Sequence, residues 1–250
     1  MPFLGDRQPG VDTPAAHFGL LAAFNLVSDD RARLARSLRD LTDEVRGLME
    51  ARPPTRRDTA YPLTETGILG PEGGTDGLAV TLSVGASLFD DRFGLAERRP
   101  RELVRMPFLA NDRLDPAQSH GGLLLALSAD QPDVLLHILR QLLRRGPGRP
   151  RRPLDAHIRM ANPRTSETAG SRILRRGFNF PRGFDAAGRL DQGLAFVSYQ
   201  KSLARGFLAV QARLKGEALE EYILPVGGGF FFVLPGAPTA DAWLGQQLLD

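Results

Sequence analysis

The sequence predicts an α+β fold, built from ferredoxin-like β-α-β units with antiparallel sheets. Short apolar or alternating segments typical of strands are interleaved with segments whose apolar residues recur every three or four positions, as in amphipathic helices. Up to Arg145 these segments follow the order strand, helix, strand, strand, helix, which is most of one ferredoxin-like unit. A chain of 250 residues is long enough for two such units.

The first strand and the first helix are predicted in residues 15–28 and 29–51. AAHFGLLAAFNLVS is mostly apolar over a length that suits a buried strand. Asp29 and Asp30 stand where a side chain can cap the start of the helix. The helix should bury one face, which carries Leu34, Leu38, Leu41, Val45 and Leu48.

Two further strands and a second helix follow. LAVTLSVGASLF (78–89) alternates as a strand does, and GGLLLALS (121–128) is a second short apolar segment. The Pro, Asp and Arg content between 90 and 120 indicates a surface loop. QPDVLLHILRQLLRR (131–145) predicts a helix with a capping Asp, and its apolar face carries Leu135, Ile138, Leu139 and Leu142.

The composition changes after the second helix, which predicts a domain boundary. RRGPGRPRRP (144–153) has no apolar side chain suited to a core, so it is predicted to link an N-terminal domain, 1–143, to a second domain, 154–250. The second domain shows only the later half of a ferredoxin-like unit. Its predicted elements are a strand at 193–200, a helix at 202–214 and a strand at 229–236. The second unit is therefore predicted to be truncated, without its opening strand and helix.

Composition excludes several kinds of protein and site. The 42% hydrophobic and 24% charged residues are ordinary for a globular protein, and no apolar run is long enough to cross a bilayer, so no membrane partner is expected. The absence of cysteine excludes disulfides, thiolate metal sites and a cysteine nucleophile. MPFLGDRQPG lacks the features of an export signal, so we expect a cytoplasmic protein, or an exported one if a signal was removed.

The segment HIRMANPRTSETAGSRILRRG (157–177) places a histidine and a pair of arginines at opposite ends. Histidine is the usual proximal ligand of haem iron, through a neutral imidazole nitrogen. An arginine stays protonated and suits a site where negative charge develops on oxygen. From the residues alone, a surface histidine and solvated loop arginines remain the alternative.

Several stretches resemble, in order, the dye-decolorizing haem peroxidases. VTLSVGASLFDDRFGL, MPFLANDRLDPAQSHGGLLLALSADQP and LLHILRQLLR are similar to the N-terminal domain of that family. HIRMANPR, SRILRRGFNF, LDQGLAFVSYQ and EYILPVGGGFFFVLPG are similar to its C-terminal part. The resemblance implies an enzyme with a haem b cofactor, and hydrogen peroxide and an organic reductant, such as a phenol or a dye, as its reaction partners.

The resemblance also assigns roles to the two ends of the segment. The histidine of the HIR motif is the proximal haem ligand in that family, which implies that His157 binds the iron. The first arginine of the ILRRG motif is the distal arginine, which implies a catalytic role for Arg175. The residues between them would wrap around the edge of the porphyrin, so that the two side chains reach opposite faces of the haem.

Three supporting residues complete the expected haem site. Arg159 and Arg164 are candidates to pair with the haem propionates, because arginine binds carboxylates through two hydrogen bonds. Glu221 is a candidate acceptor for the His157 N–H, with the neighbouring Glu220 as its rival and solvation at a helix end as the alternative for both.

One motif of the family is missing from the expected place. Family members carry a GxxDG motif before the HIR motif, and its aspartate acts as the distal acid or base. Here the helix runs directly into RRGPGRPRRPLDAHIR, so we expect this motif to be deleted. GGTDG (73–77) matches the pattern but precedes a strand, so Asp76 is predicted to be a turn residue. A distal base typically contributes about 10²–10⁴-fold to the rate, so activity without it is a hypothesis.

Alternative functions remain beside the haem peroxidase. The first is a haem-binding or haem-handling protein with little peroxidase turnover, and the second is a non-enzymatic basic module with a vestigial haem site. The basic run from Arg140 to Arg152 could attract nucleic acid, but no aromatic residue interleaves it, so a basic linker and no nucleic-acid partner are expected.

Two expectations concern histidines and assembly. His17 and His137 are expected on apolar faces, in the core or at an interface, while His120 ends a polar loop. A homo-oligomer is an open expectation, because a truncated unit would leave sheet edges that another chain could cover.

Overall fold

The structure is a computed structural model that describes residues 2–28, 30–50, 75–109, 112–145, 150–151, 172–184, 188–215 and 223–250. The chain folds into two compact units that interleave along the sequence. The first unit comprises Met1–Arg99, Gly121–Pro150 and Phe231–Asp250, and the second comprises Pro100–His120 and Arg151–Phe230. The linear division predicted at 144–153 falls mostly outside the described residues and stays a prediction.

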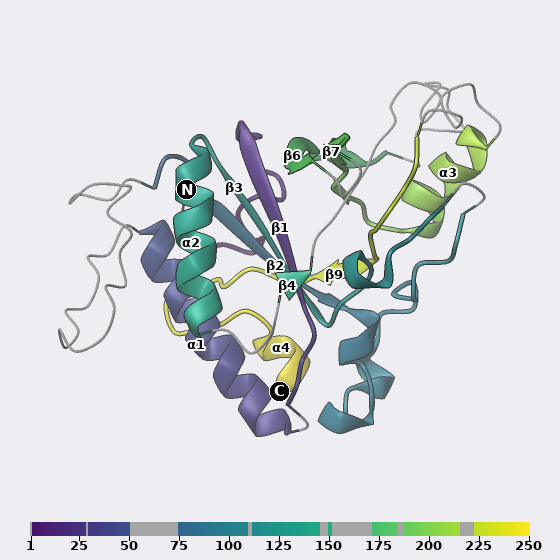
Figure 1. The fold of residues 1–250 in the computed structure, drawn as a ribbon. Helices are drawn as coiled ribbons and strands as arrows, with labels where there is room; N and C mark the ends of the chain where they lie inside the picture. The colour runs from purple at the N-terminus through teal and green to yellow at the C-terminus, as the bar shows by residue number, and fades with distance from the viewer. Residues whose placement is uncertain are drawn as a thin grey trace. The chain divides into compact units, whose positions relative to one another are not determined.

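The first unit is built on a five-stranded sheet with the strand order β4-β1-β3-β2-β9 (Figure 1). Strand β3 runs antiparallel to both of its neighbours, with Phe18 opposite Ala129 on one side and Ala79 opposite Ser128 on the other. The elements follow the order of a ferredoxin-like unit, which confirms the predicted α+β class. The strands are β1 (Phe18–Phe24), β2 (Ala79–Gly85), β3 (Leu123–Ala129), β4 (Pro150–Arg151) and β9 (Phe231–Val233).

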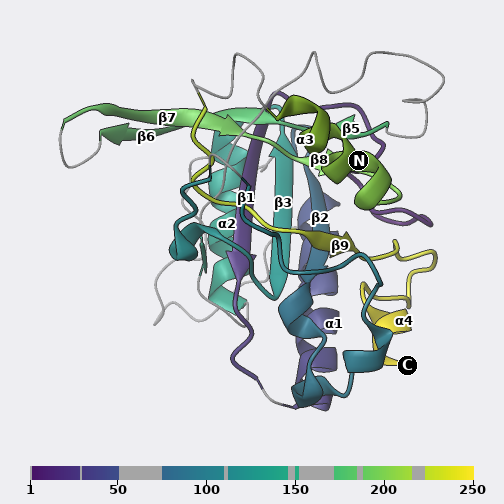
Figure 2. The ribbon, with the colours of Figure 1, turned by 90° about the vertical axis from the view of Figure 1, so that its right-hand side faces the viewer.

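Two helices, α1 (Arg31–Met49) and α2 (Pro132–Arg145), cover one face of this sheet (Figures 1 and 2). Helix α1 begins as predicted, because the Asp30 carboxylate accepts a hydrogen bond of 2.8 Å from the Ala32 N–H. Both helices bury the predicted face, apart from Leu48 and Leu139, which are half-buried. The buried positions on these faces are Leu34, Leu38, Leu41, Val45, Leu135, Ile138 and Leu142.

The two histidines expected on apolar faces have different environments. His137 of α2 is buried, as predicted. The expectation for His17 is wrong, because its side chain is 80% exposed. It precedes β1, and its Nδ1 lies 3.0 Å from the Asp130 Oδ1 at the end of β3, so it forms a polar contact at the rim of the sheet.

The last strand of the chain completes the first unit. β9 pairs with β2 in antiparallel fashion, with Phe231 opposite Gly85. The strand predicted at 229–236 is therefore shorter than expected, and it joins the sheet of the first unit instead of extending the second. The short helix α4 (Gln246–Leu249) follows it. Pairing between distant segments is not visible in local sequence patterns.

A buried side chain near the N-terminus continues this pairing. Gln8 is 1% exposed, and its Nε2 donates 2.7 Å hydrogen bonds to the carbonyls of both Leu82 and Leu234. Its Oε1 accepts from the Leu82 N–H at 2.8 Å. The Gln8 amide thus forms hydrogen bonds with backbone groups of Leu82 in β2 and of Leu234, the residue after β9. Without Gln8, these backbone groups would lose a buried hydrogen-bond partner.

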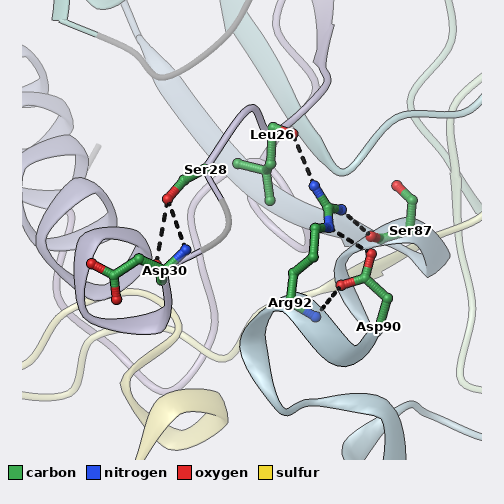
Figure 3. A network of polar contacts seen from close by, with 6 residues as sticks. All are labelled: Leu26, Ser28, Asp30, Ser87, Asp90 and Arg92. Carbon is green, nitrogen blue, oxygen red and sulfur yellow. Dashed lines mark hydrogen bonds and ion pairs between the residues drawn. The ribbon is translucent and has the colours of Figure 1, made fainter.

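Short 3₁₀ turns follow β2 where the sequence predicts the end of a strand and then a loop; they span Ala86–Leu88, Asp91–Phe93 and Ala96–Arg98. Arg92 fixes the first two of these turns to the segment just after β1 (Figure 3). Its guanidinium donates to the carbonyls of Leu26 and Ser87 at 3.1 and 3.0 Å and to the Asp90 carboxylate at 2.7 Å. The arginine of the DDRFGL stretch therefore has a structural role.

The second unit contains one long β-hairpin. Two strand pairs share a single antiparallel register, in which Leu174 lies opposite Tyr199 and Phe178 opposite Ala195. The ladder is interrupted around Gly177 and Phe196, so the strand predicted at 193–200 is divided in two, and its register shifts again between Pro181 and Phe184. In Figure 2, β6 and β7 run side by side. The strands are β5 (Leu174–Arg175), β6 (Phe178–Phe184), β7 (Leu190–Ala195) and β8 (Ser198–Tyr199).

The helix predicted at 202–214 follows the hairpin. It consists of η6 (Ala204–Leu208) and α3 (Ala209–Leu214), with a distortion at Gly206, whose ψ is −106°. The helices in the described part of the chain are too short or too polar to span a membrane.

Candidate functional site

Arg175 lies at the base of the long hairpin, where β5 pairs with β8. Its backbone is opposite Ser198, and the next residue continues the ladder through a 2.8 Å hydrogen bond from the Arg176 N–H to the Val197 carbonyl. Side chains of a strand alternate between its two faces, so the adjacent arginines point in opposite directions. Arg175 is exposed, and Arg176 is half-buried.

The glycine of the RRG motif has a steric reason. A Cβ atom on Gly177 would lie 3.0 Å from the Ala195 carbonyl oxygen, closer than ordinary side-chain contacts. The two strands approach each other here, at the interruption of the ladder. The Arg176 side chain also holds the backbone at this position, because its Nη1 donates a hydrogen bond of 3.2 Å to the Arg175 carbonyl. The backbone that carries Arg175 is thus held on both sides.

The guanidinium of Arg175 has no hydrogen bond or ion pair with the residues that the structure describes. Since arginine remains protonated at any physiological pH, this side chain is a fixed positive charge that is available to an anionic ligand. The structure also describes no group of three His, Asp or Glu side chains that could hold a metal ion.

The other predicted site residues lie outside the described part of the chain. They are His157, Arg159, Arg164 and Glu221, together with the rival Glu220. Of the predicted haem site, the structure therefore places Arg175, and the roles of the others stay predictions.

Asp76 occupies a tight turn, as predicted. Asp76 and Gly77 have φ angles of 37° and 72°, and the Leu78 N–H donates to the Thr75 carbonyl at 2.7 Å. Two successive positive φ angles define a type I′ turn, which favours Asp-Gly. The residues Thr75, Asp76 and Gly77 of the GGTDG stretch thus form the turn before β2.

Within the second unit, the VGGG stretch packs backbone to backbone against the loop that ends at His120. The Gly228 N–H donates to the Gln118 carbonyl at 3.0 Å, and the Gly228 carbonyl accepts from the His120 N–H at 2.7 Å. A Cβ on Gly227 would lie only 2.4 Å from the Gln118 carbonyl oxygen. Glycine is therefore required at this position, and two stretches that resemble the haem peroxidases meet here.

His120 has a strained backbone and a lowered pKa, which the sequence did not predict. Its φ is 63°, a region that non-glycine residues rarely occupy. The Arg105 Nε donates to its Nε2 at 3.2 Å. Burial and the nearby Arg105 charge lower the pKa of His120, so the ring accepts this hydrogen bond in its neutral form.

Glu102 attaches the same loop to the start of the helix after the hairpin. Its carboxylate accepts from the Ser202 hydroxyl at 2.8 Å and from the Ala204 N–H at 3.3 Å. The hydrogen bond from Ser202 and those from the helix backbone lower the pKa of Glu102 despite some desolvation. The carboxylate thus caps the helix from a distant part of the chain.

Three aromatic rings pack together beside the interruption of the ladder. The ring centres of Phe196 and Phe207 are 6.3 Å apart, and those of Phe207 and Phe230 are 5.9 Å apart in an edge-to-face arrangement. These contacts bring the end of β7, the helix η6 and the segment before β9 together, and they form an apolar cluster in the second unit.

Comparison with known proteins identifies the class of protein. The model of the Dyp-type peroxidase N-terminal domain matches residues 8–149, and the model of the Dyp-type peroxidase C-terminal domain matches residues 114–238. The chain therefore belongs to the Dyp-type peroxidase family. The sequence resemblance is confirmed, and family membership identifies haem b as the cofactor.

Individual relatives agree with this assignment. Deferrochelatase of Escherichia coli strain K12 is 32% identical over 368 aligned residues, which cover 99% of this chain and 87% of the relative. A DyP-type peroxidase from Streptomyces coelicolor is 26% identical with a TM-score of 0.78, and the oxyferrous complex of DtpA from Streptomyces lividans is 25% identical with the same score. Both solved structures match 99% of this chain and 96% of their own.

The alignment with Deferrochelatase is longer than this chain. It spans 368 positions against 250 residues, so at least 368 − 250 = 118 aligned positions carry no residue here. A single internal deletion before the HIR motif stays a prediction. That the omitted residues include the GxxDG motif stays a prediction.

Arg175 fits a haem site as far as the described residues reach. Its charge has no partner among them, its backbone is fixed by the ladder, and its side chain is exposed. A haem peroxidase needs a cation of this kind near the oxygen on which negative charge develops.

Proposed function

We propose that this chain is a haem peroxidase that oxidises an organic reductant with hydrogen peroxide. The single observation that carries the proposal is the position of Arg175 in the ILRRG motif of a Dyp-type peroxidase chain, where its backbone is held in a strand ladder and its exposed guanidinium has no ion pair among the described residues. Family membership supports the haem and the peroxide chemistry.

Each proposed residue has a limited task. His157 would hold the iron, Arg159 and Arg164 would bind the propionates, and Glu221 would accept the imidazole N–H. Bound haem supplies the redox chemistry with peroxide. Arg175 stabilises the negative charge that develops on the departing peroxide oxygen, in a site where fixed donors are effective.

The missing GxxDG aspartate sets the expected rate. Without a carboxylate to move the proton between the peroxide oxygens, Arg175 would contribute electrostatically only, and water would have to carry that proton from one oxygen to the other. We therefore propose a slow peroxidase, about 10²–10⁴-fold below one with a distal base.

Haem handling with little turnover is the second candidate. The name Deferrochelatase, carried by relatives at 32% identity, favours it, and so does the missing aspartate. The basic module without haem function is the third. A cytoplasmic location, or export if a signal was removed, and a homo-oligomeric state remain proposals.

A haemin titration followed by peroxide tests these candidates. We expect a saturable Soret band that His157→Ala abolishes, and peroxide-dependent dye bleaching that Arg175→Ala reduces about 10²–10³-fold while the band persists. Arg172→Ala, which removes a nearby exposed arginine, is the matched control and should leave both signals unchanged.

The outcomes separate the three candidates. A Soret band without bleaching in the unsubstituted protein would favour haem handling. Absence of the band would contradict both haem functions and leave the basic module. Equal bleaching by Arg175→Ala and the control would remove the role assigned to Arg175.

A further inference from the structure

We infer that Arg182 and Asp191 form a positioning pair that sets the register of the long hairpin and so the face on which Arg175 is presented. The inference rests on the proposed function of Arg175 and assigns roles to residues that the haem site itself does not include. It concerns the second unit alone.

The pair lies across the two strands, one step beyond the opposed residues Pro181 and Gln192. The Arg182 Nε is 2.9 Å from the Asp191 Oδ2, and its Nη2 donates to Oδ1 at 3.0 Å. The Nη2 contact is a hydrogen bond, and the Nε contact brings the two charges together without one, so the ion pair joins the two strands at this position.

Partial burial makes the attraction between Arg182 and Asp191 stronger than that of an ordinary surface ion pair. The side chains of Arg182 and Asp191 are 19% and 34% exposed, so both are partly shielded from water. Arg182 also donates from Nη1 to the Gln118 Oε1 and lies 5.2 Å from the centre of the Phe180 ring. Gln118 in turn donates to the Asp115 carboxylate at 2.9 Å, which ties the hairpin to the loop beside VGGG.

A bulge marks the same position. The register changes between Pro181 and Phe184, and Gly183, with a φ of 85°, supplies the left-handed conformation. On the strand that carries Arg175, the positions Arg175, Gly177, Asn179 and Pro181 are exposed, while Ala195, opposite Phe178, is fully buried and favours the observed register. The bulge and the ion pair add to this preference for one register over the next.

Register matters because the two arginines are adjacent. A shift by one residue would turn Arg175 toward the face that now carries Arg176 and bring Arg176 to the face that now carries Arg175. The guanidinium assigned to the haem would then change its surroundings, although the composition of the hairpin would be the same. Arg182 is thus a positioning residue that acts through the ladder.

The absence of cysteine from the chain allows the register to be measured directly. Leu174→Cys with Tyr199→Cys reports the observed register, and Leu174→Cys with Ser198→Cys reports a slip. The intrachain disulfide is quantified by mass spectrometry under a fixed oxidant in the full chain, with and without haemin. We expect Arg182→Leu to lower the ratio of native to slipped cross-link about tenfold, and Arg172→Leu to leave it unchanged.

A second readout follows the haem pocket without turnover. Fluoride binding to the ferric protein, seen in the visible spectrum, needs a nearby cation, so Arg175→Ala and Arg182→Leu should each weaken it about tenfold. Exchange of the charges, Arg182→Asp with Asp191→Arg, should restore both the cross-link ratio and the fluoride affinity. A mere loss of packing would not be restored by this exchange.

The outcomes are distinct. An unchanged cross-link ratio in Arg182→Leu would overturn the inference, and so would fluoride affinity that depends on Arg175 but is insensitive to Arg182. A protein without a Soret band would overturn the proposed function, while the cross-link ratio would still decide whether Arg182 sets the register. If Arg182→Leu does not fold, Asp191→Asn, which keeps the size of the side chain, is measured in its place.

Discussion

Arg175 and Arg176 are adjacent in the chain, yet their side chains lie on opposite faces of one strand ladder, the first exposed and the second half-buried. The Arg176 N–H and guanidinium both contact the backbone of the hairpin, at the carbonyls of Val197 and Arg175. One arginine therefore serves the fold and leaves the other available for a ligand.

Substitution of each arginine should separate these two roles. Arg176→Ala removes contacts at the base of the hairpin and should lower the free energy of unfolding by about 1 kcal/mol, whereas Arg175→Ala should change it by less than about 0.5 kcal/mol. Urea unfolding of the two variants checks this. Equal losses of stability would contradict the division of roles.

Gly177 should not tolerate a larger side chain. Gly177→Val places a branched side chain against the Ala195 carbonyl, 3.0 Å from the position of its Cβ, and should cost about 1–3 kcal/mol. Thermal unfolding measures the effect, with Asn179→Val on the exposed face as the matched control. Similar melting temperatures for the two variants would show that the strands can separate freely here.

Gln8→Leu should destabilise the first unit although leucine is the more apolar residue. The substitution leaves the Leu82 N–H and the Leu82 and Leu234 carbonyls without their buried partner, which should cost about 1–3 kcal/mol. Gln247→Leu, at an exposed position, provides the control in urea unfolding. A stability gain from Gln8→Leu would contradict this account.

His120 should make stability depend on pH in the acidic range. Burial and Arg105 lower its pKa in the folded protein below the ordinary value of 6.5, so the unfolded chain binds a proton more readily. Stability should therefore rise with pH from the lowered pKa up to about 6.5, and this contribution should level off above it.

His120→Asn tests this dependence, because asparagine tolerates the positive φ but does not titrate. Comparison of unfolding at about pH 5 and pH 8 should show a smaller difference for this variant than for the unsubstituted protein. The same substitution at the exposed His17 serves as a control. An identical pH dependence in His120→Asn and the unsubstituted chain would exclude His120 as the source.

Local patterns predicted most elements of the first unit. The 3–4 spacing of Leu34, Leu38 and Leu41 and the capping position of Asp30 depend on neighbouring residues only, and both are observed. The placement of β9 beside β2 depends instead on segments far apart in the chain. No periodicity within 229–236 could indicate which sheet would receive it.

The site was predicted less completely than the fold, for a physical reason. The type of side chain at Arg175 suggests its chemistry, but the ion pair between Arg182 and Asp191 depends on hairpin register, which a linear pattern does not specify. The lowered pKa of His120 likewise depends on burial and on Arg105 from another segment. These properties arise only when the chain has folded.

The position of β9 also has a consequence for synthesis of the protein. The strand comes from Phe231–Val233, near the C-terminal end, yet it pairs with β2 and is bridged to it by Gln8 from the N-terminal end. On the ribosome, β1, β2 and β3 would emerge long before their last partner, so the exposed edge of β2 must wait for the rest of the chain. The sheet of the first unit can therefore begin to form early in synthesis, but it is complete only after β9 has been made.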